Sequence, residues 1–192
     1  MKAVLMSIRP KWCLKIFDRL KTVEVRRTAP KEQPPFKVYM YCSKGRDMLM
    51  DIIKDGDRIY DGEVYHGKPI FIKAPEVGSI LVRRQMVVGQ FICDRIIRTS
   101  QDTIADQIKA GELDGCATGM TVEEFNRYCG EKPVYFWHIS ELKKYTKPKT
   151  LREMRFANTD TIPSRAINYP PQGWCYVDAE WKATGEPRED DE

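Results

Sequence analysis

The chain opens with two segments whose hydrophobic patterns have different periods. Residues 2–8 are rich in aliphatic side chains that alternate loosely, which predicts a first strand. Pro10 suits a first helical position, and apolar residues recur at helical spacing over the next ten residues, so a helix is expected there. The period changes to two at residues 22–26, which places two valines on one face of a strand and Glu24 and Arg26 on the other.

The rest of the chain alternates short apolar runs with turn residues. Runs rich in β-branched and aromatic residues predict strands at 36–42, 80–82, 87–93, 134–139 and 174–177. Helical patterns occur at 46–54, 100–109 and 121–130. The last helix is the best marked, because Thr121 and Glu124 form a T-x-x-E capping box and Gly130 can end it.

Many short strands with inserted helices favour an α+β domain on a small mixed β-barrel over a doubly wound sheet. Residues 1–184 are expected to form one domain, with a hairpin or inserted flap at about 55–79 and a proline-rich surface excursion at 147–173. The tail 185–192 carries five acids and one base, which is typical of a disordered end.

Composition excludes several classes of protein. The 192 residues are 42% hydrophobic and 31% charged, which suits a globular domain. The apolar runs are shorter than a membrane span or a signal peptide needs, so a cytoplasmic location is expected. The six cysteines and two histidines are scattered without ligand spacing, which predicts reduced thiols and neither a metal nor a cofactor.

The formal net charge of +4 conceals a more basic body. Without the acidic tail the chain holds 31 bases and 23 acids, and residues 1–33 alone hold nine bases and three acids. A basic body favours a polyanionic partner such as RNA, although surface charge also serves solubility.

Two segments together resemble the ASCH domain, a relative of the PUA fold. They are Leu5-Met6-Ser7-Ile8-Arg9-Pro10-Lys11-Trp12 and Lys21-Thr22-Val23-Glu24-Val25-Arg26-Arg27. The family's signature runs G-x-K-x-x-E-x-R, which Lys21, Glu24 and Arg26 match, whereas Arg19 replaces the Gly. Segments 88–91, 137–140 and 170–177 resemble longer ASCH proteins of bacterial and phage genomes. The resemblance implies a PUA-like β-barrel with surrounding helices, a polar cleft beside the first helix, and RNA or a nucleotide-like ligand in it.

In that cleft, Lys21 is expected to hold a phosphate or carbonyl oxygen and Arg26 to contact phosphate or a base edge. Glu24 would accept a hydrogen bond from a base amine or orient a water. The alternative is an ordinary solvated ion pair. The remaining candidate ligand contacts are Ser7, Arg27, Tyr41, Gln90 and His138. Trp12 could stack on a base, but its place on the apolar helix face favours a core role.

RNA or modified-nucleotide binding is thus the main hypothesis. The alternative is a metal-independent hydrolase acting on RNA or an acylated nucleoside, with Lys21 and Glu24 as catalytic residues. One ASCH subgroup hydrolyses acylated cytidine with a Lys, a Thr and a Glu; Lys21 matches the Lys, but Glu24 stands at the Thr position and Thr118 near the Glu position. That specific activity therefore does not carry over. A regulatory module that binds a protein partner through the tail and residues 147–173 is the second alternative.

Overall fold

The computed structural model describes residues 2–43, 49–51, 58–60, 63–65, 72–73, 79–81, 85–157 and 165–179. The α-helices of this part are α1 (Pro10–Phe17), α2 (Gln101–Lys109) and α3 (Val122–Cys129). Its strands are β1 (Lys2–Ile8), β2 (Val23–Arg26), β3 (Phe36–Cys42), β4 (Leu49–Asp51), β5 (Arg58–Tyr60), β6 (Glu63–Tyr65), β7 (Ile72–Lys73), β8 (Ser79–Leu81), β9 (Met86–Cys93), β10 (Ile96–Thr99), β11 (Val134–His138), β12 (Ser140–Thr150) and β13 (Trp174–Asp178). The predicted α+β class is confirmed.

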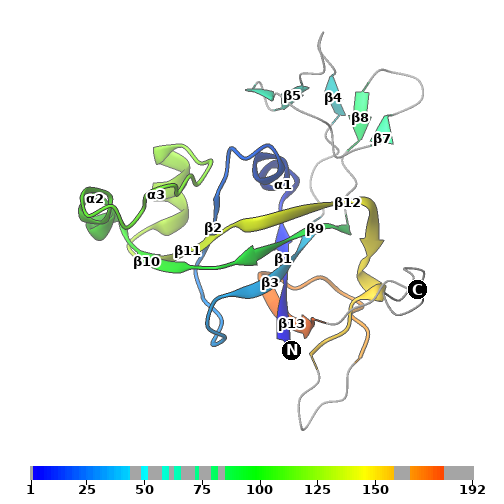
Figure 1. Ribbon diagram of the computed structural model, residues 1–192. Coiled ribbons are helices and arrows are strands. Elements are labelled where there is room, and N and C mark those ends of the chain that lie inside the picture. The colour runs from blue at the N-terminus through cyan, green and yellow to red at the C-terminus, as the bar shows by residue number, and fades with distance from the viewer. Residues whose placement is uncertain are drawn as a thin grey trace.

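Two sheets carry the fold (Figure 1). The larger has the order β12-β9-β3-β1-β13, in which β1 and β3 are parallel and the other neighbours antiparallel. The smaller is the antiparallel set β10-β11-β2, and α2 and α3 lie together beside β10 and β11. Two further small sheets are β4-β8-β7 and the β5-β6 pair. The pairings among the described strands do not close into a barrel.

One face of the large sheet packs against α1. Alternation in β1 and β3 sends every second side chain to this face, where Met6 and Met40 lie buried with Leu14 of the helix. Trp137 of β11 joins the same core, and its buried ring stands edge-on to Phe36 with 5.6 Å between ring centroids. This core holds α1 against the large sheet and joins β11 to it.

A glycine allows α1 to approach β9 closely. A Cβ atom at Gly89 would lie 2.6 Å from the carbonyl oxygen of Lys143 and 2.8 Å from the Phe17 ring. Since real Cβ atoms do not approach other atoms that closely, a larger residue at position 89 would push the helix away from the sheet. Glycine therefore sets the helix–sheet distance here.

The opposite face of the large sheet is covered by part of the predicted excursion at 147–173. Leu151, in the 3-10 helix Leu151–Glu153, is buried with Met154 and Ile167 against this face. These three apolar residues are separated by charged residues and prolines without a helical or strand period, which is why the sequence suggested surface. This part of the segment belongs to the core; residues 158–164 lie outside the described chain.

Of the other predicted elements, the α3 capping box is confirmed, one helix is wrong and two strands were not predicted. The capping box of α3 is present, with Glu124 N–H donating to Thr121 Oγ1 at 3.2 Å. The helix predicted at 46–54 is wrong where it is described, because Leu49–Asp51 pairs with β8 as a strand. Strands β10 and β12 were not predicted. Most of the flap at 55–79 and all of the tail 185–192 lie outside the described residues.

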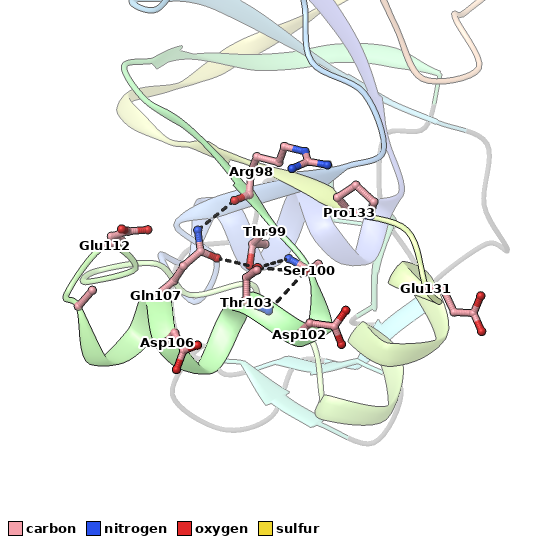
Figure 2. Close-up of a pocket in the computed structure, with 11 residues that line it drawn as sticks. Arg98, Thr99, Ser100, Asp102, Thr103, Asp106, Gln107, Glu112, Glu131 and Pro133 are labelled. Atoms are coloured by element: carbon pink, nitrogen blue, oxygen red, sulfur yellow. Dashed lines mark hydrogen bonds between the residues drawn. The ribbon is translucent and has the colours of Figure 1, made fainter.

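A pocket of about 510 Å³ opens between the end of β10 and the first turns of α2 (Figure 2). It lies next to a third core cluster, in which Phe125 of α3 packs on Phe136 of β11 with 5.9 Å between ring centroids. The pocket lining contains none of the residues that the sequence singled out for ligand binding. In the described part of the chain, every helix is too short to span a lipid bilayer.

Candidate functional site

The site begins where α1 ends. Arg19 adopts φ 62°, and its N–H donates to the Ile16 carbonyl while the Leu20 N–H donates to the Lys15 carbonyl. This pair of bonds is the Schellman ending of a helix, in which the residue at Arg19's position favours glycine. The Gly of the ASCH signature falls at this position, so its physical purpose is to turn the chain. The turn delivers Lys21 directly beside the helix.

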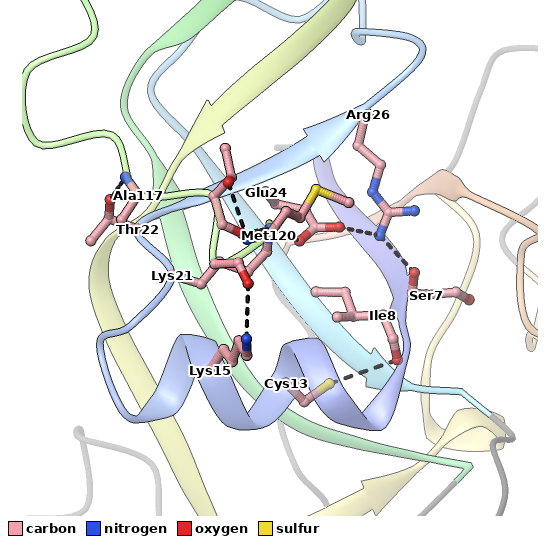
Figure 3. Close-up of polar contacts among 12 residues, drawn as sticks. Ser7, Ile8, Cys13, Lys15, Lys21, Thr22, Glu24, Arg26, Ala117 and Met120 are labelled. Atoms are coloured by element: carbon pink, nitrogen blue, oxygen red, sulfur yellow. Dashed lines mark hydrogen bonds and ion pairs between the residues drawn. The ribbon is translucent and has the colours of Figure 1, made fainter. Parts of the chain in front are cut away.

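Lys21, Glu24 and Arg26 form one buried row of alternating charges (Figure 3). The Lys21 ammonium lies 3.3 Å from Glu24 Oε2, and Arg26 Nη2 lies 3.0 Å from Glu24 Oε1. Their side chains are 2%, 7% and 13% exposed. Arg26 Nη2 also donates to the main-chain oxygen of Ser7 at 2.6 Å, which ties the row to the end of β1. The alternative of a solvated ion pair is therefore wrong.

Residues 115–121, here named the covering loop, lie across this row. Lys21 Nζ donates to the carbonyl oxygen of Thr118 at 2.8 Å, and Lys15 Nζ donates to that of Gly119 at 2.9 Å. The Thr22 hydroxyl holds the loop at both Gly115 and Ala117. The loop thus supplies main-chain acceptors to two buried ammonium groups.

Gly119 takes a conformation that its neighbours require. Its φ is +68°, and a Cβ atom there would lie 3.2 Å from both Lys15 Cδ and Lys21 Cβ. A larger residue would be strained by its backbone angle and crowded by both lysine stems. Glycine lets the covering loop sit directly on the lysines.

Three ammonium groups surround the ring of Trp12 on α1. Those of Lys11 and Lys21 each lie 5.2 Å from the ring centroid, and that of Lys15 lies 5.6 Å away. Trp12 is only partly buried against the core, so the predicted core role accounts for part of the side chain. Lys11 also pairs with Glu124 Oε1 at 3.1 Å, which links α1 to the N-terminus of α3.

Burial dominates the electrostatics of the row. Burial lowers the pKa of Lys21, the Glu24 carboxylate partly opposes this, and Arg26 and Lys15 add to the lowering. Burial also raises the pKa of the neighbouring Cys13 thiol, with further contributions from Cys42 and Glu24. The site is therefore a poorly solvated place in which a lysine gives up its proton more readily than in water.

Two buried polar atoms of the row lack hydrogen-bond partners among the described residues. Arg26 Nε has no acceptor, and Glu24 Oε2 accepts no aligned hydrogen bond although the Lys21 ammonium lies 3.3 Å away. A buried donor or acceptor without a partner costs about 1–3 kcal/mol. The row therefore retains one donor, Arg26 Nε, for a further group, whereas Glu24 Oε2 faces the Lys21 ammonium.

The other predicted contacts lie elsewhere. The Ser7 hydroxyl donates to the Pro171 carbonyl at 2.6 Å, so only the main chain of Ser7 joins the row. Arg27 packs on the Tyr128 ring and donates to the Tyr128 carbonyl. His138 pairs with Asp94, 2.7 Å from Nδ1 to Oδ1, on the opposite side of its strand pair from Glu24.

Tyr41 and Gln90 are also separated from the row. Tyr41 is buried among the core residues on the far face of the large sheet. Gln90 Oε1 accepts from the Tyr145 hydroxyl at 2.7 Å, and Tyr145 packs against that same far core. Period-two alternation could have separated these residues from the row, had the order of the strands been known.

Sequence reasoning missed Lys15 and named Thr118 only through the resemblance to one ASCH subgroup, without predicting that its loop contacts the row. The i, i+4 spacing of Lys11 and Lys15 around Trp12 was a usable signal. The partnership of Lys21 with Thr118 joins residues 97 positions apart, and no local pattern indicates it. Among the described residues, no three His, Cys, Asp or Glu side chains converge where they could hold a metal ion.

Known proteins resemble this chain in structure rather than in sequence. No family model and no curated protein matches the sequence. Solved structures similar to the chain include the crystal structure of ASCH from Zymomonas mobilis, with 14% identity, a TM-score of 0.48 and coverage of 93% of this chain and 89% of that one. Two mutant proteins of that ASCH have 16% identity and TM-scores of 0.49 and 0.48, covering 93% and 92% of this chain and 92% and 89% of theirs. The chain is thus similar over most of its length to solved structures of ASCH, the family whose signature Lys21, Glu24 and Arg26 resemble.

Proposed function

We propose that the chain is a longer ASCH protein with a PUA-like fold that binds RNA or a nucleotide-like ligand beside α1. The observation that supports this most directly is the buried Lys21–Glu24–Arg26 row next to a tryptophan surrounded by ammonium groups. Burying three charges costs stability, and proteins concentrate such arrangements at functional sites.

The chemistry of the row suits a nucleotide. A phosphate would be attracted by the ammonium groups of Lys11 and Lys15 beside Trp12. A base could stack on Trp12, since every base offers a π-face to an aromatic ring. The unpartnered Nε–H of Arg26 could donate to an acceptor on a base edge.

The covering loop must move for a ligand to reach the row. The atoms Arg26 Nε and Glu24 Oε2 are both shielded from solvent in the present arrangement. Ligand oxygens would replace the carbonyl oxygens of Thr118 and Gly119 as acceptors for Lys21 and Lys15. Binding would therefore exchange one set of hydrogen bonds for another, at a modest net cost.

Binding of a labelled single-stranded RNA, followed by fluorescence anisotropy at several salt concentrations, tests the proposal. Trp12→Leu should weaken binding about tenfold, because stacking is worth about 1–3 kcal/mol per base. Lys15→Gln should also reduce the slope of log K against log salt by about one, because one phosphate contact is lost. Lys31→Gln, an exposed lysine in another loop, is the matched control.

Two outcomes would contradict the proposal. One is an affinity that stays constant between low and high salt. The other is equal binding by the Trp12 and Lys15 variants and the Lys31 control, with all three folded by circular dichroism.

A hydrolase acting on RNA or an acylated nucleoside is the second candidate, and the lowered pKa of Lys21 favours it. A buried lysine that reaches its neutral form more readily can serve as a base or nucleophile, with Glu24 beside it as a proton acceptor. Turnover should then rise with pH through the lowered Lys21 pKa and vanish in Lys21→Ala. Equal turnover in wild type, Lys21→Ala and Glu24→Gln would remove both residues from any mechanism.

A further inference from the structure

The pocket between β10 and α2 is a second candidate site, separate from the row beside α1. It is formed by the end of β10, the first two turns of α2, the turn after α2 and the turn before β11 (Figure 2). Its volume of about 510 Å³ lies in the range of small-molecule sites. Neither Trp12 nor any member of the buried row lines it.

The lining is acidic in a chain that is basic as a whole. Its carboxylates are Asp102 and Asp106 on α2, Glu112 after the helix and Glu131 before β11, and its one cationic side chain is Arg98. The chain as a whole carries a formal charge of +4. This reversal of sign concentrates a negative potential at the pocket.

Apart from the Thr99 hydroxyl, the uncharged side-chain donors of the lining are already engaged. Gln107 Nε2 donates to the Arg98 carbonyl at 3.0 Å. Ser100 and Thr103 bond reciprocally through their hydroxyls and main-chain N–H groups at the start of α2. Carboxylates only accept hydrogen bonds when ionised, so the pocket offers many acceptors and few donors. An occupant rich in N–H groups would complement it.

Thr99 gives an independent indication of an occupant. This lining residue is 1% exposed, and its Oγ1 has no hydrogen-bond partner among the described residues. Figure 2 places it in the middle of the lining residues, above Thr103 and Ser100. A buried hydroxyl without a partner is costly, and an ammonium N–H would give it one.

The placement of the carboxylates indicates what kind of cation fits. Asp102 and Asp106 are four residues apart and lie about one turn apart on the same helix face. Glu112 and Glu131 come from two other segments at the rim. Negative charges spread in this way suit several ammonium groups along a chain better than one compact ion. Asp106 also approaches Lys109 at 3.8 Å, an exposed pair that contributes little.

We propose that this pocket binds a linear polyamine, with its ammonium groups on the carboxylates of α2 and the rim and one N–H directed at Thr99. The site goes beyond nucleotide binding and does not depend on it. Because all four of these carboxylates are exposed, the affinity should be modest and sensitive to salt.

Calorimetric titration of the full chain with spermidine tests the proposal, with magnesium chloride at matched ionic strength as the comparison cation. We expect one spermidine per chain and a tenfold weaker affinity in the double variant Asp102→Asn/Asp106→Asn. Glu32→Gln/Glu141→Gln removes the same charge at exposed positions outside the pocket and should change the affinity less than twofold.

Thr99→Val separates a ligand contact from a merely structural residue. Valine replaces the unpartnered hydroxyl with a methyl group of similar size, so the melting temperature should rise while spermidine affinity falls at least threefold. A variant that melts higher and binds spermidine unchanged would overturn the assignment of Thr99. Equal losses in the two double variants, or equal displacement by magnesium, would reduce the effect to nonspecific counterion binding and overturn the site.

Discussion

Glu24→Gln tests how the buried row is held together. The substitution removes the one negative charge between Lys21, 3.3 Å away, and Arg26, 3.0 Å away. At an effective dielectric constant of about 20, each attraction is worth about 5 kcal/mol before solvation costs. Removing one partner of a buried ion pair costs about 3–5 kcal/mol in total. We expect about 3 kcal/mol, because Lys21 can relieve part of the repulsion by losing its proton.

The pH dependence gives this prediction a distinctive sign. The pKa of folded Lys21 is already lowered by burial, and Glu24 raises it, so Glu24→Gln lowers it further. A group whose pKa is lower in the folded state than in the unfolded state makes stability rise with pH between the two values. The cost of Glu24→Gln should therefore shrink as the pH is raised from 7 toward the unfolded lysine pKa of about 10.4.

Urea unfolding at pH 7 and pH 9 measures both effects. In thermal unfolding at pH 7 the variant should melt about 6–12 °C lower than wild type, as expected for a chain of this length. Adding Lys21→Met to Glu24→Gln should recover at least about 1 kcal/mol, because it removes the unpaired cation. Exposed Glu32→Gln is the control, with an expected change under about 0.5 kcal/mol. A Glu24→Gln variant as stable as this control, or one whose cost grows with pH, would refute the reasoning.

Three further predictions concern the frame around the site. Arg19→Gly should stabilise the chain by about 1 kcal/mol in urea unfolding, because glycine accepts the φ of 62° that strains arginine; no gain would place the strain elsewhere. Gly119→Ala should cost about 1–2 kcal/mol in the same assay, since it strains the backbone against two lysine stems, and a neutral effect would mean that the covering loop adjusts freely. Met154→Ala should cost about 2–5 kcal/mol as a cavity in the far core, whereas a surface residue would cost almost nothing.

The start of the fold was predictable because it depends on local periodicity, whereas Lys21, Glu24 and Arg26 were singled out as a site by their resemblance to the ASCH signature. Helix α1, strand β2 and the shared face of Glu24 and Arg26 follow from the change of period after residue 21. The capping box of α3 was equally local. Where a pattern spanned few residues and long-range pairing decided the outcome, as for β4, prediction failed.

The sequence predicted neither the burial of the row nor the separation of Tyr41 and Gln90 from it. Both failures have the same cause, which is long-range strand and loop packing. Which face of the large sheet Tyr41 and Gln90 occupy depends on strand order, and β1 pairs with β3 in parallel, across the intervening α1 and β2. The burial of the row depends on the covering loop, whose Thr118 meets Lys21 from 97 positions further along the chain. Local chemistry was therefore predictable, while its enclosure was not.

The covering loop binds Lys21 and Lys15 through the main-chain oxygens of Thr118 and Gly119. Replacing the side chain of Thr118 leaves the acceptor for Lys21 in place, so the identity of that residue can drift among relatives without loosening the contact. Covariation between the two positions would then be absent even though their atoms lie 2.8 Å apart. The contact between Lys21 and the loop therefore depends on the length and backbone shape of the loop rather than on the side chain of Thr118.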